Sequence, residues 1–193
     1  MDIPIGETHR DALKKMIVEH SFQYRDDPPF TLACGEQSHY YFNCKATLLI
    51  PEGFALAADV CRDIVLNEFG ADGIGGLTLG ADPLTYGIAH SAWKLGRIVH
   101  PLIVRKEPKD HGTQLPIEGH VSEVSRIVAV DDVITTGGST IKAINAFRDA
   151  GLKVIGAVVL IDREEMNGKE NIEELGVPVR AVFRRSEFRI NGA

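Results

Sequence analysis

Hydrophobic and polar residues follow one another in blocks whose spacing predicts alternating helices and strands. Apolar residues recur at helical spacing in four segments, which are 9–22, 51–69, 83–95 and 139–151. Short, nearly continuous apolar runs occupy five others, which are 74–79, 98–104, 126–130, 154–161 and 177–183. Such runs suit strands that are buried on both faces, so we expect an α/β fold with a central, mostly parallel sheet flanked by helices.

Two segments depart from this alternation. Residues 40–50, YYFNCKATLLI, are rich in aromatic and branched side chains, and we expect them to be extended. Residues 105–122 are polar, carry two prolines and two glycines, and show no periodicity. A loop of that length is usually disordered or a functional lid. We therefore expect a single domain over residues 1–193 with a flexible loop at about 105–122.

Composition narrows the classes of partner. Lys and Arg total 21 against 27 Asp and Glu, a formal charge of -6, which argues against binding to nucleic acid or to an anionic membrane surface. No run approaches the ~18 apolar residues that a membrane helix needs. The three cysteines form no CxxC pair, and their odd number suits no disulfide framework. With no signal-peptide pattern at the start, we expect a cytoplasmic protein.

The stretch VAVDDVITTGGST, residues 128–140, carries the clearest chemical signal. Its strand delivers Asp131 and Asp132 to the carboxyl edge of the sheet, where ligands bind in open parallel sheets. The turn 135–139 then leads into a helix, so its backbone N–H groups and hydroxyls can cradle an anion, and Gly137 allows close approach. Carboxylates would repel a phosphate but suit sugar hydroxyls. The stretch therefore indicates a sugar-phosphate site.

Other interpretations of this stretch are a plain helix cap or another nucleotide motif. Asp, Thr and Ser precede many helices for capping alone. The P-loop pattern GxxxxGK[ST] is absent, and no GxGxxG follows a strand.

The stretch resembles the phosphoribosyl-diphosphate (PRPP) motif of type I phosphoribosyltransferases. The resemblance implies that family's fold, with a small hood mainly from 1–45 and a C-terminal segment, and a flexible catalytic loop. It implies that the two acids hold the ribose 2- and 3-hydroxyls and that the turn holds the 5-phosphate. The implied PRPP-binding residues are Asp131, Asp132, Val133, Ile134, Thr135, Thr136, Gly137, Gly138 and Ser139.

The loop sequence RKEPKDHG, residues 105–112, is similar to the catalytic loop of orotate phosphoribosyltransferases. The resemblance implies that Arg105, Lys106, Lys109 and His111 bind PRPP and act in catalysis. Lys109 would stabilise or protonate the leaving diphosphate, and the other three would clamp it. The turn TLGADP at 78–83 resembles the family's diphosphate turn and offers backbone N–H groups but no lysine.

Two further segments point to the base. Residues 30–45 are similar to the family's hood segment, with departures at Ala33, Cys34 and His39. In IDREE, Arg163 matches the family's orotate-binding arginine. The resemblance implies that the orotate-binding residues are Thr135, Arg163, Tyr41 and Phe42.

The implied reaction joins orotate to the phosphoribosyl group of PRPP and releases orotidine 5-monophosphate and diphosphate, a step of pyrimidine biosynthesis. We expect Mg²⁺ to arrive on PRPP, with no dedicated protein metal site. The resemblance also implies a homodimer with shared active sites. Alternatives are transfer to another base, a PRPP-binding regulator without catalysis, and a homologue that metabolises diphosphate.

Overall fold

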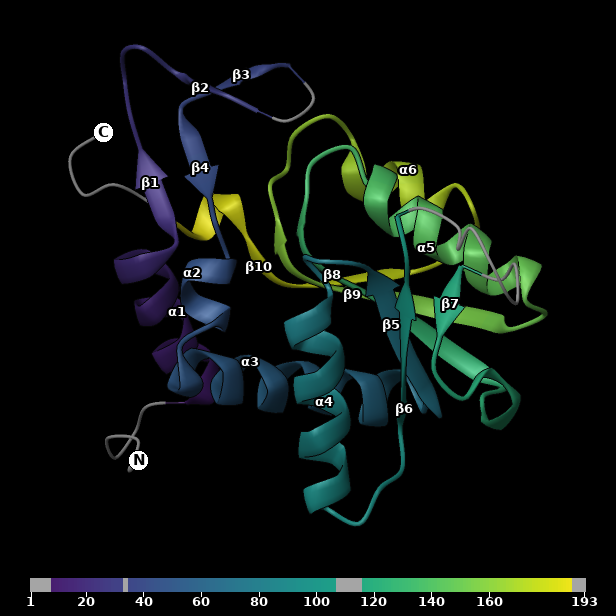
Figure 1. Cartoon of the computed structure of the whole chain (residues 1–193). Helices are drawn as coiled ribbons and strands as arrows, with labels where there is room; N and C mark the ends of the chain where they lie inside the picture. The colour runs from purple at the N-terminus through teal and green to yellow at the C-terminus, as the bar shows by residue number, and fades with distance from the viewer. Residues whose placement is uncertain (1–7, 33–34, 107–115, 189–193) are drawn as a thin grey trace.

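The computed structural model describes residues 8–32, 35–106 and 116–188. A six-stranded sheet with the order β10-β9-β8-β5-β6-β7 forms its centre (Figure 1). Its strands are β5 (Gly73–Leu77), β6 (His100–Val104), β7 (Ile117–Glu118), β8 (Arg126–Ile134), β9 (Lys153–Asp162) and β10 (Val179–Arg184). Neighbouring strands are parallel except β7, which runs antiparallel to β6. The expected α/β fold is confirmed.

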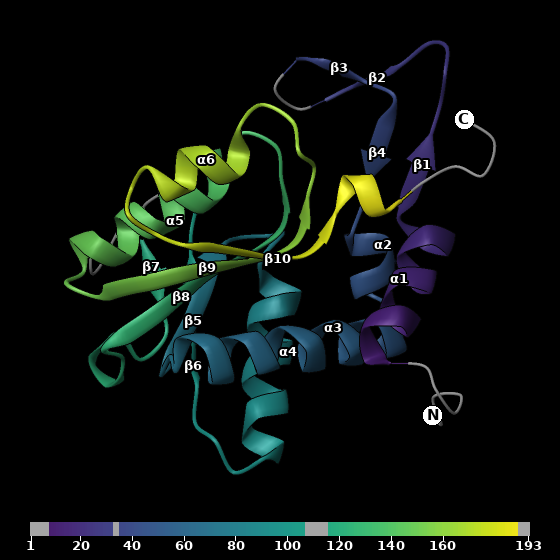
Figure 2. The same ribbon diagram turned by 180° about the vertical axis from the view of Figure 1, so that it is seen from behind.

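Helices cover both faces of this sheet (Figures 1 and 2). On one face lie α3 (Pro51–Asp63), its π-helical continuation η1 (Ile64–Phe69) and α4 (Asp82–Lys94). On the other lie α5 (Gly138–Asp149) and α6 (Gly168–Glu173). The buried apolar side chains accordingly form two clusters, one on each side of the sheet. Because both faces are covered, ligands can reach the strands only at their ends.

A small hood lies beside the sheet (Figure 1). It contains α1 (His9–His20), β1 (Phe22–Tyr24), β2 (Phe30–Thr31), β3 (Gln37–Ser38), β4 (Tyr40–Phe42) and α2 (Lys45–Leu48). The C-terminal turn η3 (Arg185–Glu187) leads Phe188 into the hood, where its ring centroid lies 5.6 Å from that of Phe22 and 5.2 Å from that of Phe42. The hood therefore brings early residues of the described chain together with Phe188.

Three sequence expectations need correction. Residues 40–50 are extended only as far as Phe42, because Lys45–Leu48 form a short helix. The strand expected at 126–130 continues to Ile134, so Asp131 and Asp132 lie within it. The region 105–122 is not wholly irregular, since Ile117–Glu118 pair with β6 and Val121–Glu123 form the 3₁₀ turn η2. Among the described residues, no helix is both long and apolar enough to cross a membrane.

Candidate active site

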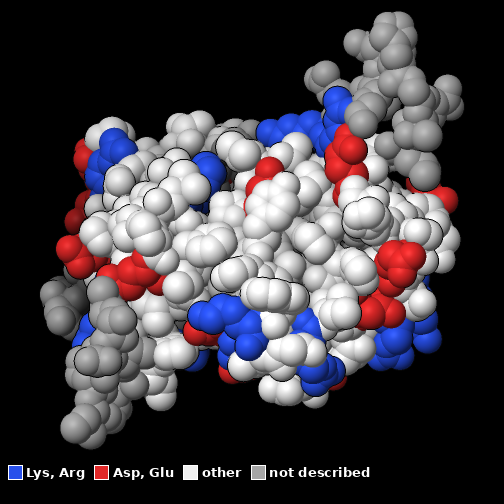
Figure 3. All heavy atoms as spheres, turned by 60° about the horizontal axis from the view of Figure 1, so that its bottom comes forward, with Lys and Arg blue, Asp and Glu red and all other residues white. Residues whose placement is uncertain are grey.

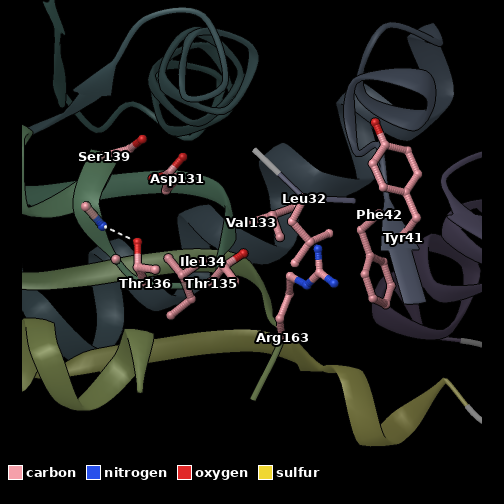
Figure 4. Close-up of a pocket in the computed structure, with 12 residues that line it drawn as sticks. Leu32, Tyr41, Phe42, Asp131, Val133, Ile134, Thr135, Thr136, Ser139 and Arg163 are labelled. Carbon is pink, nitrogen blue, oxygen red and sulfur yellow. Dashed lines mark hydrogen bonds between the residues drawn. The ribbon is translucent and has the colours of Figure 1, made fainter. Parts of the chain in front are cut away.

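A cavity of about 290 Å³ opens where the carboxyl ends of β8 and β9 face the hood (Figure 4). Its lining residues are Leu32, Tyr41, Phe42, Asp131, Val133, Ile134, Thr135, Thr136, Gly137, Gly138, Ser139 and Arg163. This set contains every described residue predicted to bind PRPP or orotate except Asp132, Arg105, Lys106 and the expected diphosphate turn at 78–83. Residues that are far apart in the sequence thus meet in one cavity, near the lower end of the size range for small-ligand sites.

The Thr/Gly turn has the geometry of an anion cradle. Gly137 has φ +77°, in the left-handed region that favours glycine, and α5 begins at the next residue. A Cβ on Gly137 would come within 2.7 Å of the Gly168 carbonyl oxygen, so the turn packs tightly against α6. The Thr136 carbonyl accepts a hydrogen bond from Asn171 Nδ2 at 3.0 Å. The turn is therefore held firmly, and Gly138 and Ser139 of the first turn of α5 line the cavity.

The two aspartates lie beside the turn that precedes α4. Asp131 is 5% exposed and accepts hydrogen bonds from Thr140 Oγ1 at 2.8 Å and from the Asp132 backbone at 3.0 Å. A Cβ on Gly80 would approach Asp132 Oδ1 to 2.7 Å and Asp131 Oδ1 to 3.6 Å. The acids expected to hold the ribose therefore adjoin the turn expected to hold the diphosphate.

Burial disfavours the doubly ionised form of the Asp131 and Asp132 pair. Removal from water, together with the adjacent charge of Asp132, raises the pKa of Asp131 to about 7. Burial also raises the pKa of Asp132, against the opposing charge of Lys45. The pair therefore exchanges a proton in the neutral range, and full ionisation is unfavourable without a ligand.

This arrangement predicts that Asp131→Asn stabilises the free protein at alkaline pH. The folded pKa lies above the unfolded one, so the native state binds more protons between about pH 4 and 7 and wild-type stability falls as pH rises through that window. Asparagine carries no such charge. Melting temperatures should agree within about 2 °C at pH 4, and the variant should melt about 4 °C or more higher at pH 8. A difference that is independent of pH would contradict the assigned cause.

Arg163 forms the wall between the cavity and the hood (Figure 4). Its side chain is 4% exposed, and Nη2 donates to Tyr40 O at 2.8 Å and to Ser38 Oγ at 3.0 Å. Nη2 also lies 2.9 Å from Glu165 Oε2. Nε is buried and has no hydrogen-bond partner among the described residues. A buried donor left unpaired is costly, so this nitrogen is suited to a ligand oxygen.

Other predicted residues lie elsewhere. The Arg105 backbone N–H donates to Pro116 O at 2.8 Å, and its guanidinium lies 3.5 Å from Glu118 Oε1. Arg105 and Lys106 do not line the cavity. His39, one of the three departures from the hood segment, does not line the cavity either, and its Nδ1 lies 3.1 Å from Arg25 O. Four predicted or noted residues, Lys109, His111, Ala33 and Cys34, lie outside the described residues.

The sequence interpretation overlooked several contacts of the site. Leu32 lines the cavity beside Tyr41, although an apolar residue in a polar segment gives no specific signal. Arg163 contacts Ser38, which lies 125 residues earlier in the sequence, and Glu165, which lies two residues later. Thr140 orients Asp131 from the first turn of α5. A hydroxyl nine residues after an acid, on the next element, could have suggested the last contact.

Known proteins resemble this chain over most of its length. A family model described as the phosphoribosyl transferase domain matches residues 99–179. An orotate phosphoribosyltransferase from Leptospira biflexa is 40% identical over 186 residues, which cover 95% of this chain and 100% of the relative. Another from Aquifex aeolicus is 42% identical over 179 residues, which cover 93% of this chain and 97% of the relative.

A solved structure agrees with these relatives. The orotate phosphoribosyltransferase of Mycobacterium tuberculosis H37Rv in complex with PRPP matches with a TM-score of 0.73 and 26% sequence identity, over 95% of this chain and 93% of that one. The fold is therefore that of the type I phosphoribosyltransferases. Identity of about two residues in five, across nearly the full length of curated relatives, shows that the chain belongs to the orotate phosphoribosyltransferase family.

Proposed function

We propose that this protein transfers the phosphoribosyl group of PRPP to orotate, giving orotidine 5-monophosphate and diphosphate. One observation carries the proposal: a buried arginine with an unpaired Nε and a Thr/Gly anion cradle line the same cavity. A carboxylate-bearing base and a sugar phosphate would then meet between them. The relatives that bear the name orotate phosphoribosyltransferase support the same reaction.

PRPP would lie along the carboxyl end of β8. The turn 135–139 would bind the 5-phosphate through backbone N–H groups and hydroxyls at the N-terminus of α5. Asp131 lines the cavity and would accept a hydrogen bond from a ribose hydroxyl. Asp132 faces Gly80, so we assign it to the hydroxyl nearer the diphosphate turn.

Orotate would lie between Arg163 and the hood. Its carboxylate would accept from the guanidinium, because Arg163 supplies planar, fixed donors. Tyr41, Phe42 and Leu32 would wall the pyrimidine ring, and Thr135 would contact both the ring and the phosphate turn.

Transfer at C1 of the ribose would develop positive charge on the sugar, as in glycoside cleavage. The protein would hold both reactants in line and neutralise the departing diphosphate. We assign the second task to Arg105, Lys106, Lys109 and His111, with Lys109 as the residue that stabilises or protonates the leaving group. This assignment rests on the loop sequence, since Lys109 and His111 lie outside the described residues.

The donor set of the site fits Mg²⁺ carried by PRPP. In the described parts of the chain, no group of three or more His, Cys, Asp or Glu side chains could hold a metal ion. The two adjacent carboxylates, Asp131 and Asp132, supply hard oxygen atoms near the diphosphate turn, and Mg²⁺ commonly takes its other ligands from phosphates and water. When bound, Mg²⁺ would offset the negative charge of the diphosphate.

The cytoplasmic location stays a prediction from the sequence.

A homodimer is supported by an apolar surface on α4. Exposed large apolar side chains gather on this helix and its flanking turns: Leu79, Tyr86, Trp93, Leu95 and Ile98. Tyr86 and Trp93 are seven residues apart and therefore share one side of the helix. Figure 3 shows the molecule from the side of α3 and α4, with a broad area lacking charged residues and charges near its margins. A second copy of the chain would cover such a patch.

This surface predicts that Tyr86→Glu combined with Trp93→Glu weakens the dimer about 100-fold or more, because two aromatic anchors are replaced by charges. Sedimentation velocity over a concentration series measures the change. Val18→Glu is the matched control, since Val18 is 48% exposed on α1, away from this surface. A monomeric wild type, or a dimer unaffected by the double variant, would contradict the proposed interface.

Base specificity tests the proposed function. PRPP consumption with Mg²⁺ should be rapid with orotate and slow with uracil, adenine, hypoxanthine and xanthine. Uracil matters most, because it lacks the carboxylate assigned to Arg163. Activity with a purine alone would replace the proposal by transfer to another base. PRPP binding without turnover of any base would favour a regulatory protein.

A further inference from the structure

A three-residue cluster lies behind the cavity wall that Arg163 forms. Ser38 from β3 of the hood and Glu165 from the segment after β9 meet at the same guanidinium nitrogen, Arg163 Nη2. Ser38 Oγ accepts from Nη2 at 3.0 Å and donates to Glu165 Oε1 at 2.9 Å. Glu165 Oε2 lies 2.9 Å from Nη2. The hydroxyl therefore bridges the two charged groups and connects the hood to the segment after β9.

The cluster engages one guanidinium nitrogen and leaves another unpaired. Nη2 donates hydrogen bonds to Ser38 Oγ and to the Tyr40 carbonyl oxygen, and Glu165 Oε2 lies 2.9 Å from it as an ion pair without a hydrogen bond of its own. Nε is buried and unpaired within the described residues. Figure 4 shows the guanidinium extending into the space between Val133 and Phe42. Nη2 is thus bound to protein, and the Nε donor remains for an oxygen of a ligand.

We infer that Glu165 is a positioning residue for recognition of the orotate carboxylate, with Ser38 as its link to the hood. Glu165 does not line the cavity, so it acts through Arg163 and not by contact with the base. The inference rests on the proposed function. Glu165 would thus favour the binding of orotate, although its carboxylate carries the same negative charge as the carboxylate of orotate.

The charge of Glu165 matters because the guanidinium would otherwise be a buried cation with neutral partners. A buried ion pair holds its members in a narrow set of geometries, and loss of one member leaves the other uncompensated. The local backbone also holds Glu165 in place. Its neighbours Glu164 and Met166 have φ of 54° and 53°, an uncommon conformation for non-glycine residues. The Glu164 side chain is anchored through Oε2 to the Ser186 backbone at 2.8 Å.

Glu165→Gln tests the inference, because it removes the charge and keeps the shape. The KM for orotate should rise about tenfold or more, while kcat and the KM for PRPP change less than about threefold. Glu165→Asp should recover part of the loss, since it restores the charge. Glu170→Gln is the matched control: Glu170 is an exposed carboxylate on α6, and this variant should match wild type.

An unchanged KM for orotate in Glu165→Gln would overturn the inference. So would equal increases of both KM values with a lower melting temperature, because that pattern describes general destabilisation. If Glu165→Gln does not fold, Ser38→Ala serves in its place and should raise the KM for orotate alone. A wild-type protein that does not use orotate would refute the proposed function itself, which is a separate result from these.

Discussion

Arg163→Ala is expected to lower kcat/KM for orotate about 1,000-fold, or about 4 kcal/mol of transition-state stabilisation. The KM for PRPP should change less than about threefold, because the phosphate cradle belongs to other elements. Steady-state kinetics with each substrate varied in turn separates the two effects. Among the described residues that line the cavity, Arg163 is the residue with a fixed positive charge, and its Nε is unpaired.

The size of this effect follows from burial. Arg163 is 4% exposed, so a carboxylate bound to it would be shielded from water, where charge-assisted hydrogen bonds are strong. Arg163→Lys should recover only a small part of the loss, since an ammonium group cannot reproduce a planar fork of donors.

Arg148→Ala controls for the loss of an arginine as such. Arg148 lies on α5, is exposed, and donates to the Leu175 carbonyl at 2.8 Å, remote from the cavity lining. Its orotate kinetics should match wild type. If the Arg163→Ala variant is folded and its kcat/KM for orotate lies within about tenfold of the wild-type value, the assigned role is excluded.

Asp131→Asn is expected to lower kcat/KM for PRPP about 100-fold. A ribose hydroxyl donates to the carboxylate, whereas an asparagine that keeps its acceptor oxygen toward Thr140 would present N–H donors to the sugar. Kinetics with PRPP varied at saturating orotate measure the loss. The same substitution should stabilise the free protein at pH 8, so activity and stability would move in opposite directions.

The pH dependence gives this prediction a second signature. Because the pKa of Asp131 is raised to about 7, wild-type kcat/KM for PRPP should increase as pH rises through that value and the carboxylate ionises. In Asp131→Asn this rise should be absent. Asp149→Asn, an exposed residue at the end of α5, should retain it. A wild-type profile retained by Asp131→Asn would remove Asp131 from the binding of PRPP.

Local pattern sufficed for the main elements and for the phosphate turn. Buried parallel strands are continuous apolar runs, and the helices between them have regular apolar spacing, so β5, β8, β9, α4 and α5 could all be predicted. The turn was predictable because its residues are adjacent in sequence. The extension of β8 through Asp131 and Asp132 was missed because aspartate is rare in strands and its pairing with β9 decides the outcome.

Contacts between distant segments could not be predicted in the same way. The helix at Lys45–Leu48 is four residues long, too short for periodicity to reveal. Ser38 and Arg163 are 125 residues apart, and only the packing of the hood against β9 brings them together. The two-residue strand Ile117–Glu118 depends on the exposed edge of β6. These features come from tertiary structure, and each adjoins the site or its loop.

The conversion of orotate by the purified wild-type protein tests the central claim most directly. With PRPP and Mg²⁺ present, loss of orotate absorbance should be matched mole for mole by orotidine 5-monophosphate and diphosphate, and it should stop when PRPP is omitted. Stable orotate absorbance in the presence of PRPP and Mg²⁺, in a protein that is folded and binds PRPP, would contradict the account.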